Sequence, residues 1–298
     1  MIPRIDAHHH VWDLATRDQA WITGSAMAPI RRNFSIDDLA GEVAAAGVAA
    51  TVVVQTVADL AETEELLDLA EVTPLVAGVV GYVDLAAPDV GEELDRLRER
   101  PSGAWLAGIR NPVQDEPDPA WLVRPAVLAG LREVARHDLV YDLLIRPHQL
   151  DAALSAVTHV PEGRYVIDHL AKPAIASGGW EPWASGFARL AARGNVSAKL
   201  SGLVTEASWN AWSTSDLRPY AEHALAELGP DRLLFGSDWP VCTLAAPYGR
   251  VIAAAEQLVD GLSTTERAAV MGGTATTVYG LAGRSAADAP DDPDQVIP

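Results

Sequence analysis

Eight short apolar runs recur along the 298-residue chain, and a stretch with helical periodicity separates each run from the next. Most runs are apolar throughout rather than alternating, which is typical of strands buried on both faces of a parallel sheet. A chain that alternates such strands with helices can adopt only a few folds. The runs cover residues 2–8, 50–55, 76–83, 106–110, 140–146, 164–169, 196–200 and 233–237.

The stretches between the runs carry helix signals. Ser35, followed by Asp37 and Asp38, indicates a capped helix start, and Ala46-Gly47 indicates its end. Further helices are predicted over 62–70, 90–100, 126–137, 149–157, 183–193, 217–228, 249–258, 264–271 and 274–281. This order predicts an α/β protein with a (β/α)₈ TIM barrel, and a doubly wound open sheet is the alternative.

Nucleotide-binding versions of the open sheet lack their usual sequence signals here. The first run is not followed by Gly-x-Gly-x-x-Gly, and the chain has no phosphate-binding Gly-x-x-x-x-Gly-Lys-Ser/Thr loop. We therefore expect one barrel domain over residues 1–282. The remaining residues, 283–298, are rich in Ala, Asp and Pro, and we expect them to form a disordered tail.

The charge balance excludes several classes of partner. A net charge of −19 argues against nucleic acid and against an anionic membrane surface, because both attract clustered Lys and Arg. The single cysteine, Cys242, rules out an intrachain disulfide framework, and we expect it to be a buried thiol. No signal peptide and no apolar run of membrane-spanning length is evident, so we expect a cytoplasmic protein with a small-molecule substrate. The sequence leaves a homo-oligomer open.

A His-x-His pair, His8 and His10, lies at the end of the first run. Strand alternation places both imidazoles on one side, where they can share a divalent metal or hold one anionic oxygen. Asp238 follows the last run and so also lies at a strand end. The alternatives are a remnant of an expression tag, and structural histidines that fill polar gaps in a core.

Polar side chains follow almost every run. In a barrel, the carboxyl ends of the strands meet at one face, where active sites of such barrels lie. We therefore expect these side chains to converge at one rim. In chain order they are His8 and His10, Gln55, Tyr82 or Asp84, Arg110, Arg146 with His148, Asp168 and His169, Lys199 with Ser201, and Asp238.

These segments resemble the lactonase branch of the amidohydrolase superfamily, which includes sugar lactone hydrolases of the L-fuconolactone and L-rhamnonolactone types and pyrone-dicarboxylate lactonases. Two of them read Asp168-His169-Leu170-Ala171-Lys172-Pro173 and Phe235-Gly236-Ser237-Asp238-Trp239-Pro240. The likeness runs from about residue 3 to residue 282, and eight motifs occur in order. It is carried by residues 6–10, 54–56, 62–64, 78–84, 108–110, 168–173, 199–202 and 235–240.

The resemblance implies a metallo-dependent-hydrolase-like TIM barrel and a set of site residues. Asp238 would take a proton from the attacking water, and His169 and Arg110 would also be catalytic. One divalent, zinc-like metal would be held by His8, His10, His169 and Asp238. Arg110 stands where many metal-dependent members carry a Lys or Glu ligand, and arginine cannot ligate a metal. Metal-free catalysis is therefore the alternative. The family's usual glycine is Ala171 here, a change that we expect to matter little.

Lactone hydrolysis would need a base and a stabilised oxyanion. The pKa of an ordinary aspartate is too low for a good base, so we expect a metal, or burial beside Trp239, to assist Asp238. The oxyanion could be held by a metal, by imidazolium groups or by Arg110. Arg110 could instead pair with Asp84 or Asp115, and Lys199 with Asp168. We expect the substrate to be bound by His148, Lys199, Gln55, Trp21 and Trp239.

The predicted function is hydrolysis of a small sugar lactone, such as an L-fucono- or L-rhamnono-lactone, to the sugar acid. The chain would then be a hydrolase of carboxylic esters in carbohydrate metabolism. Two alternatives stay open. The first is a metal-dependent decarboxylase of a hydroxy-aromatic acid on the same barrel, and the second is a non-catalytic protein that binds sugar acids.

Overall fold

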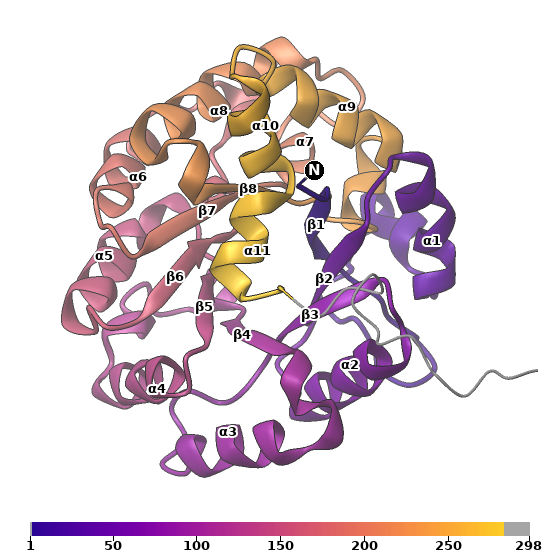
Figure 1. Cartoon of the computed structure of the whole chain (residues 1–298). Helices are drawn as coiled ribbons and strands as arrows, with labels where there is room; N and C mark the ends of the chain where they lie inside the picture. The colour runs from indigo at the N-terminus through magenta and orange to yellow at the C-terminus, as the bar shows by residue number, and fades with distance from the viewer. Residues whose placement is uncertain (1, 283–298) are drawn as a thin grey trace, which may run out of the picture.

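A computed structural model describes residues 2–282 of the chain. Eight parallel strands form one sheet in the order β1-β2-β3-β4-β5-β6-β7-β8, with every neighbouring pair hydrogen-bonded (Figure 1). The predicted (β/α)₈ barrel is confirmed, and the open sheet is wrong. The strands are β1 Ile5–His9, β2 Ala50–Val54, β3 Val76–Gly81, β4 Leu106–Asn111, β5 Val140–Leu143, β6 Arg164–Ile167, β7 Val196–Leu200 and β8 Leu233–Phe235.

The ends of the sheet meet through the chain that follows β8. His9 forms a parallel bridge with Trp239, and the His10 amide donates to the Trp239 carbonyl at 2.7 Å. The Asp238 amide donates to the His8 carbonyl at 2.8 Å. This closure brings residue 238 beside the first strand, although Asp238 lies 228 positions after His10 in the sequence.

Helices surround the barrel on the outside (Figure 1). The first one begins as predicted, because Ser35 and Asp38 form a reciprocal capping box. The helices are α1 Ile36–Ala45, α2 Leu60–Val72, α3 Val90–Glu99, α4 Pro125–Arg136, α5 Leu150–His159, α6 Trp183–Ala191, α7 Leu203–Glu206, α8 Thr214–Leu228, α9 Tyr248–Leu258, α10 Thr264–Ala268 and α11 Thr274–Tyr279. The predicted helix over 264–271 is wrong beyond residue 268, where a π-turn follows, and α7 was not predicted.

The last helix, α11, lies across the amino-terminal end of the barrel (Figure 1). Tyr279 and Leu281 pack with small and apolar strand residues such as Ala7 and Val52 in a cluster that fills this end. A β-carbon added to Gly78 would lie 2.9 Å from Leu281 Cδ2, so glycine lets β3 approach Leu281, which follows α11. One end of the barrel is thus closed, and the carboxyl ends of the strands are left to form a site.

Two expectations about the rest of the chain can be compared with the structure. Cys242 is fully buried, and burial holds the pKa of its thiol well above the ordinary value, so it is an unreactive core residue as expected. None of the helices within residues 2–282 combines the length and apolar character needed to cross a membrane. The predicted tail, 283–298, lies outside the described residues.

Candidate active site

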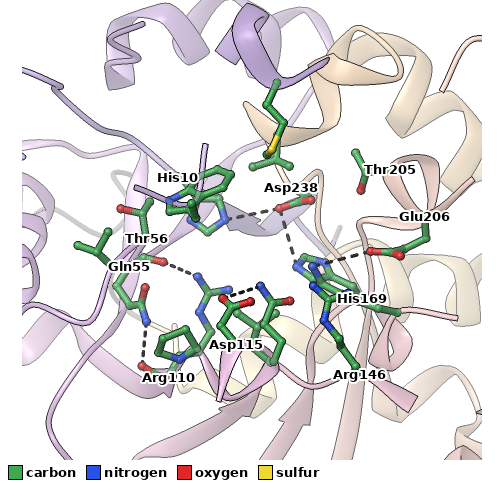
Figure 2. A pocket seen from close by; sticks show the side chains of 18 of the residues that line it. His10, Gln55, Thr56, Arg110, Asp115, Arg146, His169, Thr205, Glu206 and Asp238 are labelled. Atoms are coloured by element: carbon green, nitrogen blue, oxygen red, sulfur yellow. Dashed lines mark hydrogen bonds and ion pairs between the residues drawn. The ribbon is translucent and has the colours of Figure 1, made fainter. Parts of the chain in front are cut away.

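A cavity of about 540 Å³ opens at the carboxyl ends of the strands (Figure 2). Its wall mixes charged, polar and apolar side chains, which is typical of a small-molecule site. The residues at its edge are His10, Gln55, Thr56, Arg110, Gln114, Asp115, Arg146, His169, Lys172, Thr205, Glu206 and Asp238, with Ala20, Trp21, Met27, Val57, Ala58, Pro112, Leu144, Trp209, Val241 and Leu244.

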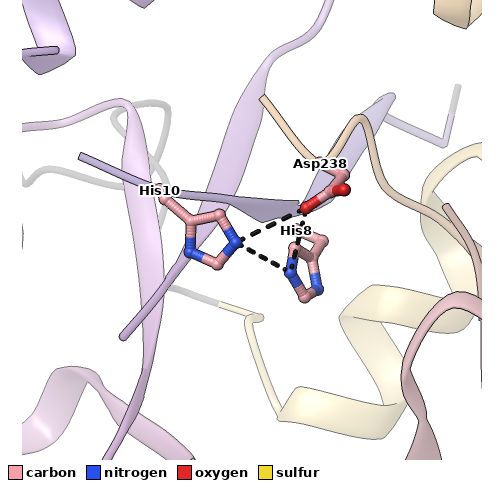
Figure 3. Close-up of side chains that lie close together, drawn as sticks. All are labelled: His8, His10 and Asp238. Atoms are coloured by element: carbon pink, nitrogen blue, oxygen red, sulfur yellow. Dashed lines mark hydrogen bonds and ion pairs between the residues drawn. The ribbon is translucent and has the colours of Figure 1, made fainter. Parts of the chain in front are cut away.

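His8, His10 and Asp238 lie close together (Figure 3), and His10 and Asp238 line the cavity. Nε2 of His8 lies 3.2 Å from Nε2 of His10. Oδ1 of Asp238 lies 3.5 Å from His10 Nε2 and 3.7 Å from His8 Nε2. All three side chains are almost completely buried. The prediction that the first and last strands bring these groups to a common mouth therefore agrees with the structure.

The backbone around Asp238 explains how the carboxylate is fixed. Its φ is 60°, a left-handed value that few residues other than glycine and Asn or Asp adopt. The carboxylate of Asp6 accepts the amides of Ser237 at 2.8 Å and His8 at 3.2 Å, so it ties the two segments together. A β-carbon at residue 236 would lie 2.6 Å from the Cβ of His8, so Gly236 is needed for this approach.

His169 reaches the same group from the end of β6. Residues 169–172 all have left-handed φ values between 50° and 60°, and this turn aims His169 and Lys172 at the cavity. Ala171 thus holds a conformation that glycine adopts without steric cost. Nδ1 of His169 lies 2.8 Å from Ser201 Oγ, and its Nε2 lies 3.9 Å from Asp238 Oδ1.

Buried, ion-paired side chains fill the barrel interior between the cavity and α11. Arg110 Nη1 donates to Asp168 Oδ2 at 3.0 Å, and Lys199 Nζ lies 2.9 Å from Asp168 Oδ1. The same ammonium donates to Asp142 at 2.5 Å, and the hydroxyl of Tyr279 donates to Asp142 at 2.8 Å. These contacts therefore connect α11, at the amino-terminal end of the barrel, with Arg110 in the cavity wall.

Two electrostatic expectations need correction. Burial alone would raise the pKa of Asp238, but His169 and His10 hold it below the ordinary value, so burial beside Trp239 does not make this carboxylate a stronger base. Burial lowers the pKa of His169 to about 4 and that of His8 well below 6.5. These two imidazoles are neutral near pH 7, so they can act as N–H donors but not as imidazolium ions.

The predicted substrate-binding residues divide into two groups. Gln55 and Trp21 line the cavity. The amide nitrogen of Gln55 donates to the Arg110 carbonyl at 2.9 Å, and the indole of Trp21 donates to Gln19 at 2.7 Å. Both are thus fixed in the wall by protein contacts.

The other three lie away from the cavity. Lys199 is completely buried in its ion pairs with Asp142 and Asp168, so it cannot touch a substrate. Trp239 is buried against Phe34, with ring centroids 5.3 Å apart. His148 is exposed and does not line the cavity. These three predicted substrate-binding residues therefore lie outside the cavity wall. The suggested pairing of Arg110 with Asp84 or Asp115 is wrong, because its partner is Asp168.

Arg146 and His148 were both expected at the rim, and only Arg146 lines the cavity. Two further residues of the wall were not predicted as site residues. Lys172 and Glu206 both line the cavity, 3.8 Å apart. The Lys-Pro pair after His169 was a signal for Lys172, whereas nothing in the sequence marked Glu206.

The donor set fits one divalent metal ion. The ligand atoms of His8, His10 and Asp238 lie within 4.8 Å of one another, and two imidazoles with a carboxylate suit zinc. Nδ1 of His10 lies 2.7 Å from the Val54 carbonyl, which fixes the proton there and leaves Nε2 free to ligate. Arg110 Nη1 lies 3.3 Å from Nε2 of His8, so a fixed positive charge also adjoins this group.

Comparisons with known proteins agree with this geometry. Residues 5–281 match the family model described as amidohydrolase. An L-fucono-1,5-lactonase from Burkholderia ambifaria is 40% identical over 280 residues, which cover 93% of this chain and 95% of the relative. A zinc-bound amidohydrolase structure from Burkholderia multivorans is 37% identical with a TM-score of 0.87, covering 93% of this chain and 99% of that one. A 2,6-dihydroxybenzoate decarboxylase from Rhizobium, 14% identical with a TM-score of 0.64 over 94% of this chain and 99% of that one, shares the fold alone.

Proposed function

Because this chain belongs to the amidohydrolase family, we propose that it hydrolyses a small sugar lactone to the sugar acid, with Asp238 as the base. One observation carries the proposal. An ionised, buried carboxylate lies within 3.9 Å of three imidazoles at a cavity whose wall mixes charged, polar and apolar side chains. The resemblance to an L-fucono-1,5-lactonase over nearly the whole chain supports a sugar lactone as the substrate.

Asp238 would remove a proton from water as the water oxygen adds to the ring carbonyl carbon. The ring carbon–oxygen bond then breaks, and the departing alkoxide takes the proton back from Asp238. The acid product leaves with one proton to release to solvent. Because the pKa of Asp238 is low, the reaction depends on groups that lower the energy of the oxyanion.

Arg110 and His169 are the candidates for holding this oxyanion, because both line the cavity beside Asp238 (Figure 2). The planar guanidinium can donate two parallel hydrogen bonds to an oxyanion, and the ion pair with Asp168 fixes its position. Removal of one such donor typically costs ~2.7–4 kcal/mol of barrier. A neutral His169 would add a hydrogen bond but no charge.

A metal bound by His8, His10 and Asp238, with His169 adjacent, would polarise the water and ease its deprotonation. Metal-free catalysis, with Arg110 as the main electrophile, is the other form of the proposal. Removal of metal by chelation and dialysis, followed by assay with and without added zinc, separates the two forms. Activity that survives complete metal removal ends the metal-dependent form.

The direct test is a panel of aldonolactones assayed with a pH indicator, since each turnover releases acid. We expect turnover of at least one 6-deoxy-sugar lactone, at a rate well above the buffer blank. 2,6-Dihydroxybenzoate is the counter-substrate for the decarboxylase alternative. Release of carbon dioxide from it, together with no lactone turnover, would overturn the lactonase proposal.

A further inference from the structure

Glu206 brings a carboxylate to the cavity wall beside two cations. It ends the short helix α7, and its side chain points into the cavity (Figure 2). Its Oε1 lies 3.8 Å from the Nζ of Lys172. The pKa of Glu206 is raised, because the effect of burial exceeds that of the positive charges of Lys172 and Arg146, which lower it; both cations therefore act on this carboxyl group.

The charges on the cavity wall cancel. Arg110, Arg146 and Lys172 contribute three positive charges, and Asp115, Glu206 and Asp238 contribute three negative ones. Among residues 2–282, Arg146 has no carboxylate within ion-pair distance, and Glu206 lies near enough for the charge of Arg146 to lower its pKa. Without Glu206, Lys172 and Arg146 would present two cations suited to a substrate carboxylate.

We propose that Glu206 is a specificity-determining residue whose carboxylate occupies the place that a substrate carboxylate would otherwise take. The pocket then accepts neutral polyhydroxy lactones and rejects lactones that carry a carboxylate group. This inference rests on the proposed lactonase function and narrows its substrate class. A neutral hydroxyl can donate to Glu206 and accept from Lys172, whereas an anionic group would face the like charges of Glu206 and Asp238.

The test compares two lactones of similar size. One is a neutral aldono-1,4-lactone, and the other is an aldaro-1,4-lactone that differs by a terminal carboxylate. We expect the wild-type enzyme to prefer the neutral lactone in kcat/KM by at least about 10²-fold, because like charges brought together in a pocket are strongly unfavourable. Glu206→Gln keeps the shape of the side chain and removes its charge. It should reduce this preference by at least about tenfold.

Glu222→Gln is the matched control, because it makes the same change at an exposed residue of α8 that does not line the cavity. Solvent screens that charge, so the preference should stay within about threefold of wild type. A wild-type enzyme that hydrolyses both lactones equally well would overturn the inference. So would an unchanged preference in Glu206→Gln.

Binding of the product acids provides a second readout that does not need turnover. Calorimetry with an aldonate and an aldarate should show tighter aldarate binding in Glu206→Gln and Glu206→Ala than in wild type. Equal aldarate binding in all three proteins would contradict the inference. If no lactone is hydrolysed by the wild type, the proposed function fails. If neutral lactones are hydrolysed but the preference does not move, this inference alone fails.

Discussion

Lys199 provides the sharpest test of the buried charges beneath the cavity. Its ammonium lies 2.5 Å from Asp142 and 2.9 Å from Asp168, and all three side chains are completely buried. Lys199→Met keeps most of the volume of the side chain and leaves two buried carboxylates without their shared cation. Removal of one partner from a buried ion pair costs about 3–5 kcal/mol of unfolding free energy, and we expect this range near neutral pH.

The pH dependence of this loss follows from Asp142. Burial raises its pKa to about 6 even with Lys199 present, and without Lys199 the pKa must rise further. A raised carboxyl pKa contributes stability that is present at low pH and is lost as the pH rises through the folded value. Below pH 6, Asp142 is protonated in both the wild type and Lys199→Met, so the difference between their unfolding free energies is constant. Above pH 6 only the variant keeps the proton, and its deficit grows by about 1.4 kcal/mol per pH unit.

Chemical denaturation followed by circular dichroism at pH 5.5 and pH 8 measures this difference. The deficit of Lys199→Met should be larger at pH 8 by about 2–3 kcal/mol. Arg189→Met is the control, because Arg189 pairs with Asp151 at 2.5 Å on the exposed surface, where such pairs contribute about 0–1 kcal/mol. A loss of unfolding free energy below about 1 kcal/mol at pH 8, or an equal loss at both pH values, would show that Lys199 does not neutralise Asp142 in the folded protein.

Three further predictions concern the fold and the site. Gly202 has a φ of 65°, and a β-carbon there would lie 2.5 Å from Nδ1 of His169. Gly202→Ala should therefore lower lactone turnover at least about tenfold and reduce stability by about 1–3 kcal/mol in a denaturation assay. Gly41 lies within α1 with open space at its β-position, so Gly41→Ala should leave turnover unchanged and stabilise the protein by about 0.5–1 kcal/mol; a loss of stability there would contradict the helix packing. Burial lowers the pKa of His9 to about 3 and that of His169 to about 4, so both bind a proton more weakly in the folded state than in the unfolded state. The stability that each neutral histidine contributes is complete above pH 6.5 and is lost on acidification, at about 2 kcal/mol per histidine by pH 5. The denaturant concentration at the unfolding midpoint should therefore be lower at pH 5 than at pH 7. A higher midpoint at pH 5 would show that these rings are charged in the folded protein.

The sequence was sufficient for the barrel because each strand is a nearly continuous apolar run, and that pattern does not depend on tertiary detail. The convergence of His8, His10 and Asp238 could also be predicted, because strand ends converge in any parallel barrel. Asp238 was informative because it directly follows a short apolar strand.

The remaining site residues depend on details that a one-dimensional pattern does not contain. Lys199 points into the barrel, but two buried carboxylates from β5 and the end of β6 hold it below the cavity. His148 was displaced from the rim because β5 ends earlier than its apolar run, which left Arg146 at the wall. Glu206 lies on a helix of four residues, α7, and this length is too short to show helical periodicity.

Asp238→Asn shows whether Asp238 is the base, because it keeps the size of the side chain and removes the proton acceptor. Turnover of a lactone by the wild type and by this variant at pH 7 should be measured together with binding of the product acid. We expect kcat to fall by roughly 10²–10⁴-fold while the variant still folds and binds the acid. A variant that hydrolyses the lactone within about threefold of the wild-type rate would show that a different group activates the water.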